Sequence, residues 1–195
     1  MTMNYVDPSE LRLSGENPYM MLYNEEGGPV TTFVSLWRIY LSPYGEGHSL
    51  FLRSELTGDQ PMVWTDNIML TRWIQEEITA KDNAFSDSSI KAIDASFIRH
   101  GNCLTEVTHE VVSRDDDISL TWFDFLPAFA GIRGHDLAAG RTHGHYATYV
   151  PAQRVKVTRN GTDCVGAPIE RDREGWKSSS AFLALAETWV RARED

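Results

Sequence analysis

The feature that most constrains the fold of this chain is a series of segments in which apolar residues alternate with polar ones. Alternation with a period of two is typical of strands that bury one face. In 31–41, Phe33 and Trp37 alternate with polar residues, and after a Pro- and Gly-containing loop the alternation resumes in 48–57. These two segments therefore predict a β-hairpin.

The same pattern predicts further strands along the chain, separated by residues typical of turns. The Asn160-Gly161 pair is the strongest short hairpin signal. Because strands follow one another without regular intervening helices, the order argues against a doubly wound parallel sheet. The expected additional strands are 90–99, 103–113, 118–126, 143–150, 152–159 and 162–169.

Two helices are predicted from apolar residues that recur three and four positions apart. Asp66 is a candidate N-cap for a helix over 67–79, whose apolar stripe includes Leu70 and Trp73. A second stripe, which includes Phe182 and Trp189, predicts a C-terminal helix over 178–193. Residues 1–28 are rich in Pro, Gly and Asn, and we expect them to form a loop-rich N-terminal arm.

Together these elements predict a mainly β (α+β) fold in one domain, 1–195. The expected architecture is an antiparallel curved sheet or closed β-barrel of about eight strands, with one internal and one C-terminal helix. Its shape is similar to that of lipocalin barrels, although no motif of the chain carries membership of that family. A barrel of this size can enclose one small ligand.

The charge of the chain excludes some partners. Against 28 Asp and Glu there are 18 Lys and Arg, which gives a net charge of −10. Nucleic acids and anionic membranes attract clustered Lys and Arg, so neither is an expected partner.

The first residues do not resemble a signal peptide, no long apolar run is present, and the two cysteines lack C-x-x-C spacing. We therefore expect a cytoplasmic protein.

The first candidate catalytic residues are His109 and Asp124. His109 lies on the apolar face of its strand, and Asp124 shares a face with Trp122 on the next one. We expect an inward-facing pair in which the carboxylate orients the imidazole for acid–base chemistry. The alternatives are a hydrogen-bonded core histidine and an aspartate that caps a loop.

A second constellation is His143-Gly144-His145, followed by Tyr149. On a strand, His143, His145 and Tyr149 share one face, and the two imidazoles could hold a divalent metal. Hydrogen-bonded histidines without a metal are the alternative. The third ligand that a metal needs stays open among His135, Asp136, His109 and Asp124.

The glycine-containing segment 130–142 precedes this strand and is a candidate lid. Arg133 and Arg141 within it could clamp a ligand carboxylate. A plain connection is the alternative. Trp37 and Trp122 are expected to line a cavity for a flat apolar ligand.

These residues predict a small-molecule enzyme that acts on an apolar or aromatic metabolite. Nucleotide-binding motifs are absent from the sequence, so we expect no nucleotide cofactor and an isomerase, lyase/hydratase or cyclase type of reaction. His109, Asp124, His145 and Tyr149 are the expected acid–base groups. A non-catalytic binder of hydrophobic ligands and a protein–protein module, which includes a homodimer, are the alternatives.

Overall fold

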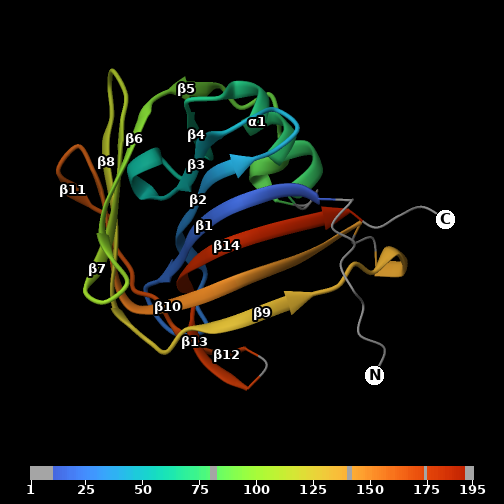
Figure 1. Cartoon of the computed structure of the whole chain (residues 1–195). Coiled ribbons are helices and arrows are strands. Elements are labelled where there is room, and N and C mark those ends of the chain that lie inside the picture. Colours follow the sequence, from blue (N-terminus) through green and yellow to red (C-terminus); the bar gives the residue numbers. More distant parts are fainter. Residues whose placement is uncertain (1–10, 80–82, 140–141, 174, 192–195) are drawn as a thin grey trace.

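The computed structural model describes residues 11–79, 83–139, 142–173 and 175–191. This part of the chain is mainly β (Figure 1). The strands are β1 Leu11–Tyr23, β2 Val30–Leu41, β3 Gly47–Arg53, β4 Met62–Thr65, β5 Ala92–Asp94, β6 Ser96–Asn102, β7 Glu106–Val112, β8 Asp117–Phe125, β9 Phe129–Arg133, β10 His143–Arg159, β11 Thr162–Asp163, β12 Glu170–Arg173, β13 Trp176–Ser179 and β14 Ala181–Arg191.

One curved sheet has the strand order β5-β4-β3-β2-β1-β14-β10-β8-β7-β6, and β9 and β11 also pair with β10. Ala95 joins β5 directly to β6, so the two ends of this order meet and the sheet forms a nearly closed barrel (Figure 1). Among the described strands only β4 and β5 pair in parallel. The curved, mainly β architecture is confirmed, with more strands than the eight expected.

Apolar side chains occupy the interior of the barrel. Trp64 and Trp122, the largest of them, are fully buried and belong to a cluster that draws residues from both halves of the sheet. Small barrels are commonly filled in this way. The interior is therefore a packed core, and the cavity described below lies elsewhere.

A short helical segment covers the outer face of β1–β3. It consists of α1 (Ile68–Trp73), a π-helical turn (Ile74–Ile78) and a 3₁₀ turn (Ala84–Ser86). Asn67, and not Asp66, caps α1, because its side chain accepts a hydrogen bond from the Leu70 amide at 3.1 Å. Leu70 and Ile74 are fully buried in a second apolar cluster against the sheet. Further 3₁₀ turns are Glu55–Thr57 and Leu137–Ala139.

The expected C-terminal helix is wrong, because the segment forms β14 between β1 and β10. Ala186 has φ of 49°, and the pairing of β14 with both neighbours shifts register around it. Such a bulge exchanges the two faces of a strand. Phe182 before the bulge and Glu187 and Trp189 after it therefore share the outer face. When a strand is apolar on both faces and a bulge exchanges those faces, its apolar residues no longer alternate along the sequence. Their spacing then resembles the apolar stripe of a helix.

The N-terminal expectation is also wrong for residues 11–23, which form β1 in the middle of the sheet. Gly15 and Asn17 resemble turn residues but have roles in the strand. A Cβ at Gly15 would lie 2.3 Å from the Arg38 carbonyl oxygen, so the close approach of β2 requires glycine. The Asn17 amide donates hydrogen bonds to Ser35 Oγ and to the Leu36 carbonyl oxygen.

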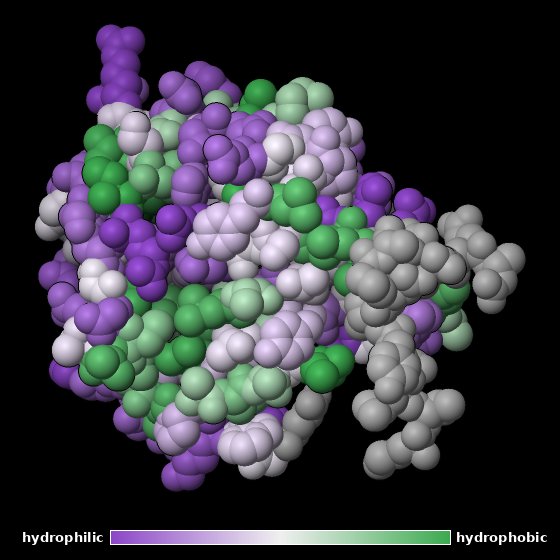
Figure 2. Space-filling view, in the orientation of Figure 1, coloured by the Kyte–Doolittle hydropathy of each residue, from purple (hydrophilic) through white to green (hydrophobic). Residues whose placement is uncertain are grey.

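Several shorter segments also differ from expectation. The segments 143–150 and 152–159 form one strand, β10, and only Thr162–Asp163 of 162–169 is a strand. The first residues of the candidate lid, 130–133, belong to β9, which pairs with β10. In Figure 2, apolar residues gather on the part of the surface where Figure 1 shows β9, β10 and β14.

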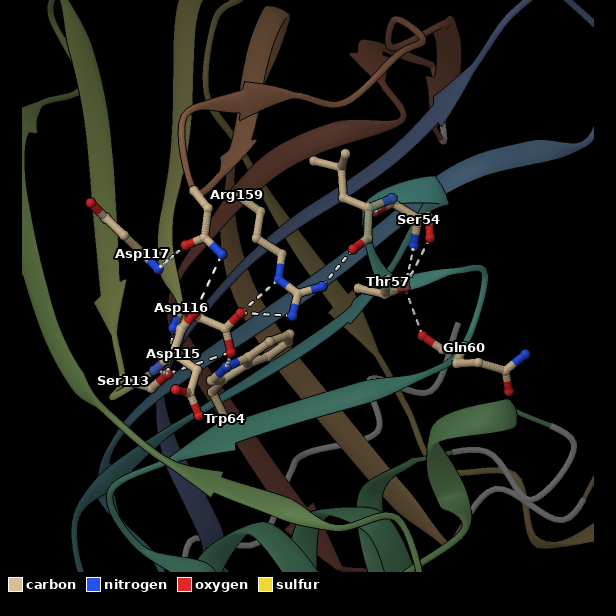
Figure 3. Close-up of polar contacts among 11 residues, drawn as sticks. Ser54, Thr57, Gln60, Trp64, Ser113, Asp115, Asp116, Asp117 and Arg159 are labelled. Atoms are coloured by element: carbon tan, nitrogen blue, oxygen red, sulfur yellow. Dashed lines mark hydrogen bonds and ion pairs between the residues drawn. The ribbon is translucent and has the colours of Figure 1, made fainter.

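A buried polar network holds the ends of the sheet together beside β4 (Figure 3). Asp116, in the turn between β7 and β8, accepts hydrogen bonds from Trp64 Nε1 at 2.9 Å and from Arg159 Nε at 2.7 Å. Arg159, at the end of β10, also donates to the Leu56 carbonyl oxygen. The network thus connects β4 with the far end of the strand order.

Candidate functional site

A cavity of about 190 Å³ lies between the outer face of the sheet and the helical segment. Half of its lining residues are aromatic. The strands β1, β2, β3 and β14 supply one side, and residues 78, 79, 83 and 85 supply the other. Its lining residues are Asn17, Tyr19, Phe33, Ser35, Trp37, Phe51, Ile78, Thr79, Asn83, Phe85, Glu187 and Trp189.

Glu187 is the ionisable group of greatest interest in this wall. It is 5% exposed, and its carboxylate oxygen accepts a hydrogen bond from Trp189 Nε1 at 2.6 Å. Burial raises the pKa of Glu187 to about 7, whereas the Trp189 bond and the positive charge of Arg173 lower it by less. The carboxyl therefore exchanges a proton near neutral pH.

Other polar groups of the cavity are held in place by contacts with the sheet. Burial raises the pKa of Tyr19 to about 12, so its phenol stays a neutral hydrogen-bond donor. The Tyr19 ring stacks on Phe182 with centroids 5.1 Å apart. The hydrogen bond between Asn17 and Ser35 fixes two more polar side chains of the wall.

Beside the cavity, a chain of hydrogen bonds ends at His145, whose ring packs against Trp189. Arg173 donates to Tyr149 Oη at 3.1 Å, and this hydroxyl lies 3.2 Å from His145 Nε2. The His145 ring stacks on Trp189 with centroids 4.9 Å apart. Burial is the main cause that lowers the pKa of His145 to about 4, so the imidazole is neutral at pH 7.

The predicted shared face of His143, His145 and Tyr149 is confirmed, because all three lie buried on the outer face of β10. Both imidazoles pack against Trp189. Within the residues that the structure describes, no group of three or more potential metal ligands occurs, so the two histidines lack a third ligand there. Burial also lowers the pKa of His143.

His109 points into the barrel as expected and is 3% exposed. The edge of its ring meets Trp122, with centroids 5.8 Å apart. Burial, followed by the positive charge of Arg99, lowers the pKa of His109 to about 3. Trp122 is part of the packed core, so neither residue lines the cavity.

The expected pair of His109 and Asp124 is wrong. Asp124 has φ of 56°, which interrupts the alternation of β8 and turns the side chain outward. There it accepts a hydrogen bond from Arg154 on the surface, and this bond lowers the pKa of the carboxyl. Asp124 and His109 therefore lie in separate environments.

The other residues that we expected to contact a ligand have different outcomes. Trp37 lines the cavity, with its ring 6.3 Å from that of Trp189. Arg133 is exposed on β9, opposite His145 in register. Arg141 lies outside the described residues. The structure therefore does not describe an arginine clamp.

Two residues of this region were missed by the sequence analysis. Glu187 lay inside the expected helix, where its face could not be assigned. Arg173 lay in the charged run 170–174, which is typical of a solvated turn, but it forms part of the hairpin of β12 and β13. Its guanidinium lies 4.0 Å from the centre of the Tyr149 ring. An acidic residue among apolar neighbours was the one available signal for Glu187.

The fold and the cavity define a class: a barrel-shaped, mainly β protein with an aromatic cavity outside the barrel and a buried carboxyl in its wall. Comparisons with protein-family models, curated proteins and solved structures found no match. None of the described helices has the length and apolarity needed to cross a membrane.

Proposed function

We propose that this protein is a small-molecule enzyme that binds an apolar or aromatic molecule in the cavity and uses Glu187 for acid–base chemistry. The observation that carries the proposal is a buried carboxyl in a cavity wall half of whose residues are aromatic; burial there raises the pKa of Glu187 to about 7. Burying a carboxyl without a charged partner is costly, so such groups are concentrated at functional sites.

The size and lining of the cavity support a substrate with a single ring. A cavity of about 150 Å³ is large enough for benzene, and this one has about 190 Å³. Tyr19 and Asn17 provide polar contacts for one substituent. A group that both takes and returns a proton at neutral pH suits isomerase, lyase/hydratase and cyclase reactions, which need no net redox change.

The pH dependence of the free energy of unfolding tests whether the pKa of Glu187 is raised in the folded chain. Its pKa in the folded chain is raised to about 7 from 4.5. The folded state therefore binds more protons than the unfolded state between these values, and the free energy of unfolding falls as pH rises through this window. The expected fall is about 3 kcal/mol, at roughly 1.4 kcal/mol for each pH unit. Glu187→Gln should remove it, and Glu106→Gln, at an exposed position of β7, should not.

Function is tested with cyclohex-3-enone, a ring ketone whose double bond migrates into conjugation by proton transfer. We expect its conversion, followed by ultraviolet absorbance, to be at least tenfold slower in Glu187→Gln. Quenching of Trp37 and Trp189 fluorescence by the same compound should be retained in the variant, which is isosteric. Equal turnover by both forms contradicts the role of Glu187. Binding of cyclic ketones and phenols without turnover of any supports the non-catalytic binder instead.

A further inference from the structure

A second acid–base arrangement lies away from the cavity, in a groove of about 560 Å³ at the other edge of the helical segment. Three parts of the chain form this groove: the end of β2, the start of β3, and the turn between β4 and α1. Its lining residues are Arg38, Ile39, Tyr40, Glu46, Gly47, His48, Asp66, Asn67 and Ile68.

Asp66 holds His48 at two atoms. One carboxylate oxygen accepts from the His48 backbone amide at 2.6 Å, and the other lies 2.6 Å from the ring Nδ1. The Phe97 ring stacks on the imidazole, with centroids 4.9 Å apart and planes 11° apart. These contacts fix both the orientation of the ring and the nitrogen that carries the proton.

The local chain is shaped for this contact. A Cβ at Gly47 would lie 2.7 Å from Asn67 Cβ and 3.0 Å from Asp66 Oδ1, so only glycine lets the start of β3 approach the turn. Asn67, rather than Asp66, caps α1, which leaves the Asp66 carboxylate to His48.

The second ring nitrogen, Nε2, is the reactive one. With Nδ1–H bonded to a carboxylate, Nε2 has a free lone pair and is the basic atom. Within the described part of the chain it has no hydrogen-bond partner, and the His48 side chain is 26% exposed. A ligand in the groove can therefore reach a correctly oriented base.

Arg38 supplies a positive charge beside this base. It lies directly opposite His48 in the β2–β3 register, and both residues line the groove. The Arg38 guanidinium lies 5.4 Å from the centre of the Tyr40 ring and 3.9 Å from a Glu16 oxygen. These contacts hold the arginine at the groove, where it can stabilise negative charge that develops on an oxygen.

We propose that this groove is a second catalytic site, which removes a proton from a carbon acid whose oxygen becomes negatively charged beside Arg38. In a carbonyl compound, the C–H bond next to the carbonyl breaks, and the proton moves to His48 Nε2. The electron pair moves through the carbon–carbon bond to the oxygen, which forms an enolate. Where the carbonyl compound carries a β,γ double bond, this enolate is conjugated with it. Return of the proton from His48 to the γ-carbon then moves the double bond next to the carbonyl and completes an isomerisation, with no other reactant.

The probe is 5-nitrobenzisoxazole, which opens in one proton-abstraction step to a coloured phenolate. The base takes the ring C–H proton, that electron pair completes the nitrile, and the nitrogen–oxygen bond breaks with its electrons on oxygen. All measurements use the Glu187→Gln chain, because a buried carboxylate could also open the probe. A failure here is therefore separate from a failure of the cavity proposal.

We expect His48→Gln to lower kcat/KM for the probe about 100-fold. Arg38→Gln and Asp66→Asn should each lower it about tenfold, through kcat for Arg38 because the phenolate charge develops only in the reaction. The matched control is His100→Gln, since His100 also contacts a carboxylate, Glu110, but lies on the exposed surface. It should stay within about twofold of the parent chain.

Thermal melts identify any variant that does not fold. The assignment then rests on the rates of those variants among His48→Gln, Arg38→Gln and Asp66→Asn that do fold. A rate for His48→Gln equal to that of His100→Gln overturns the proposal. So does a parent rate no higher than that of the same concentration of free imidazole. If Arg38→Gln changes KM alone, Arg38 binds the probe without stabilising its charge, and its assigned role is overturned.

Discussion

Replacing Asp116 by alanine should destabilise this protein more than any other single change on its surface turns. In Figure 3 the Asp116 carboxylate lies between Trp64 and Arg159. Trp64 is fully buried, the Arg159 side chain is 20% exposed, and Asp116 itself is 5% exposed. Alanine leaves a buried indole N–H and a largely buried guanidinium without their acceptor.

The magnitude follows from these exposures. An unpaired buried donor costs about 1–3 kcal/mol, and the breaking of a buried ion pair costs about 3–5 kcal/mol in total. Arg159 keeps its bond to the Leu56 carbonyl oxygen, which favours the lower part of that range. For a chain of this length about 1 kcal/mol corresponds to 2–4 °C, so Tm should fall by roughly 6–20 °C.

The assay is urea unfolding followed by tryptophan fluorescence, with thermal melts by circular dichroism. Asp115→Ala is the matched control, because Asp115 is exposed in the same turn and only its backbone oxygen accepts from Asn160. It should lie within about 0.5 kcal/mol of the parent chain. Asp116→Asn keeps one acceptor and should have an intermediate effect. If Asp116→Ala and Asp115→Ala unfold at the same urea concentration, the network does not hold the barrel closed.

Two further predictions concern the bulge and the core histidine. Ala186→Gly should leave the free energy of unfolding unchanged or raise it by up to about 1 kcal/mol. Ala186→Val should lower it by about 1–3 kcal/mol, because a β-branched residue resists the positive φ at this position. Urea midpoints in the opposite order refute the bulge. The His109 ring should give the NMR shifts of a neutral imidazole down to about pH 4, because its pKa is lowered to about 3. Its contribution to stability falls as pH drops below 6.5, where only the unfolded chain takes up the proton; a ring that titrates near 6 refutes the burial argument.

The local signals of this sequence predicted the strands that bury one face. β2 and β3 form the expected hairpin but bury side chains on both faces, because the helical segment covers their outer side. The pair β7 and β8 follows the expected alternation, because period-two patterning and turn residues act between near neighbours in the chain. The shared face of His143, His145 and Tyr149 was predictable for the same reason. The inward direction of His109 followed from its apolar neighbours on one strand face.

The candidate site itself was not predictable in this way. Trp37 was expected at a cavity, but Glu187 reaches the same cavity only because a bulge at Ala186 exchanges the faces of β14. The pairing of His48 with Asp66 likewise depends on two loops that meet in space. Among three successive acidic residues at 115–117, only the packing of Trp64 and Arg159 decides which one is buried.

The sequence by itself determined a mainly β chain with a curved sheet, since alternating apolar faces can be buried in few other ways. Tertiary structure alone decided that 11–23 and 181–191 are central strands, because their formation depends on hydrogen bonds and packing from distant strands. It also decided where a ligand can bind. Long side chains from both halves of the sheet fill the barrel, so the aromatic cavity and the groove beside His48 both lie outside it.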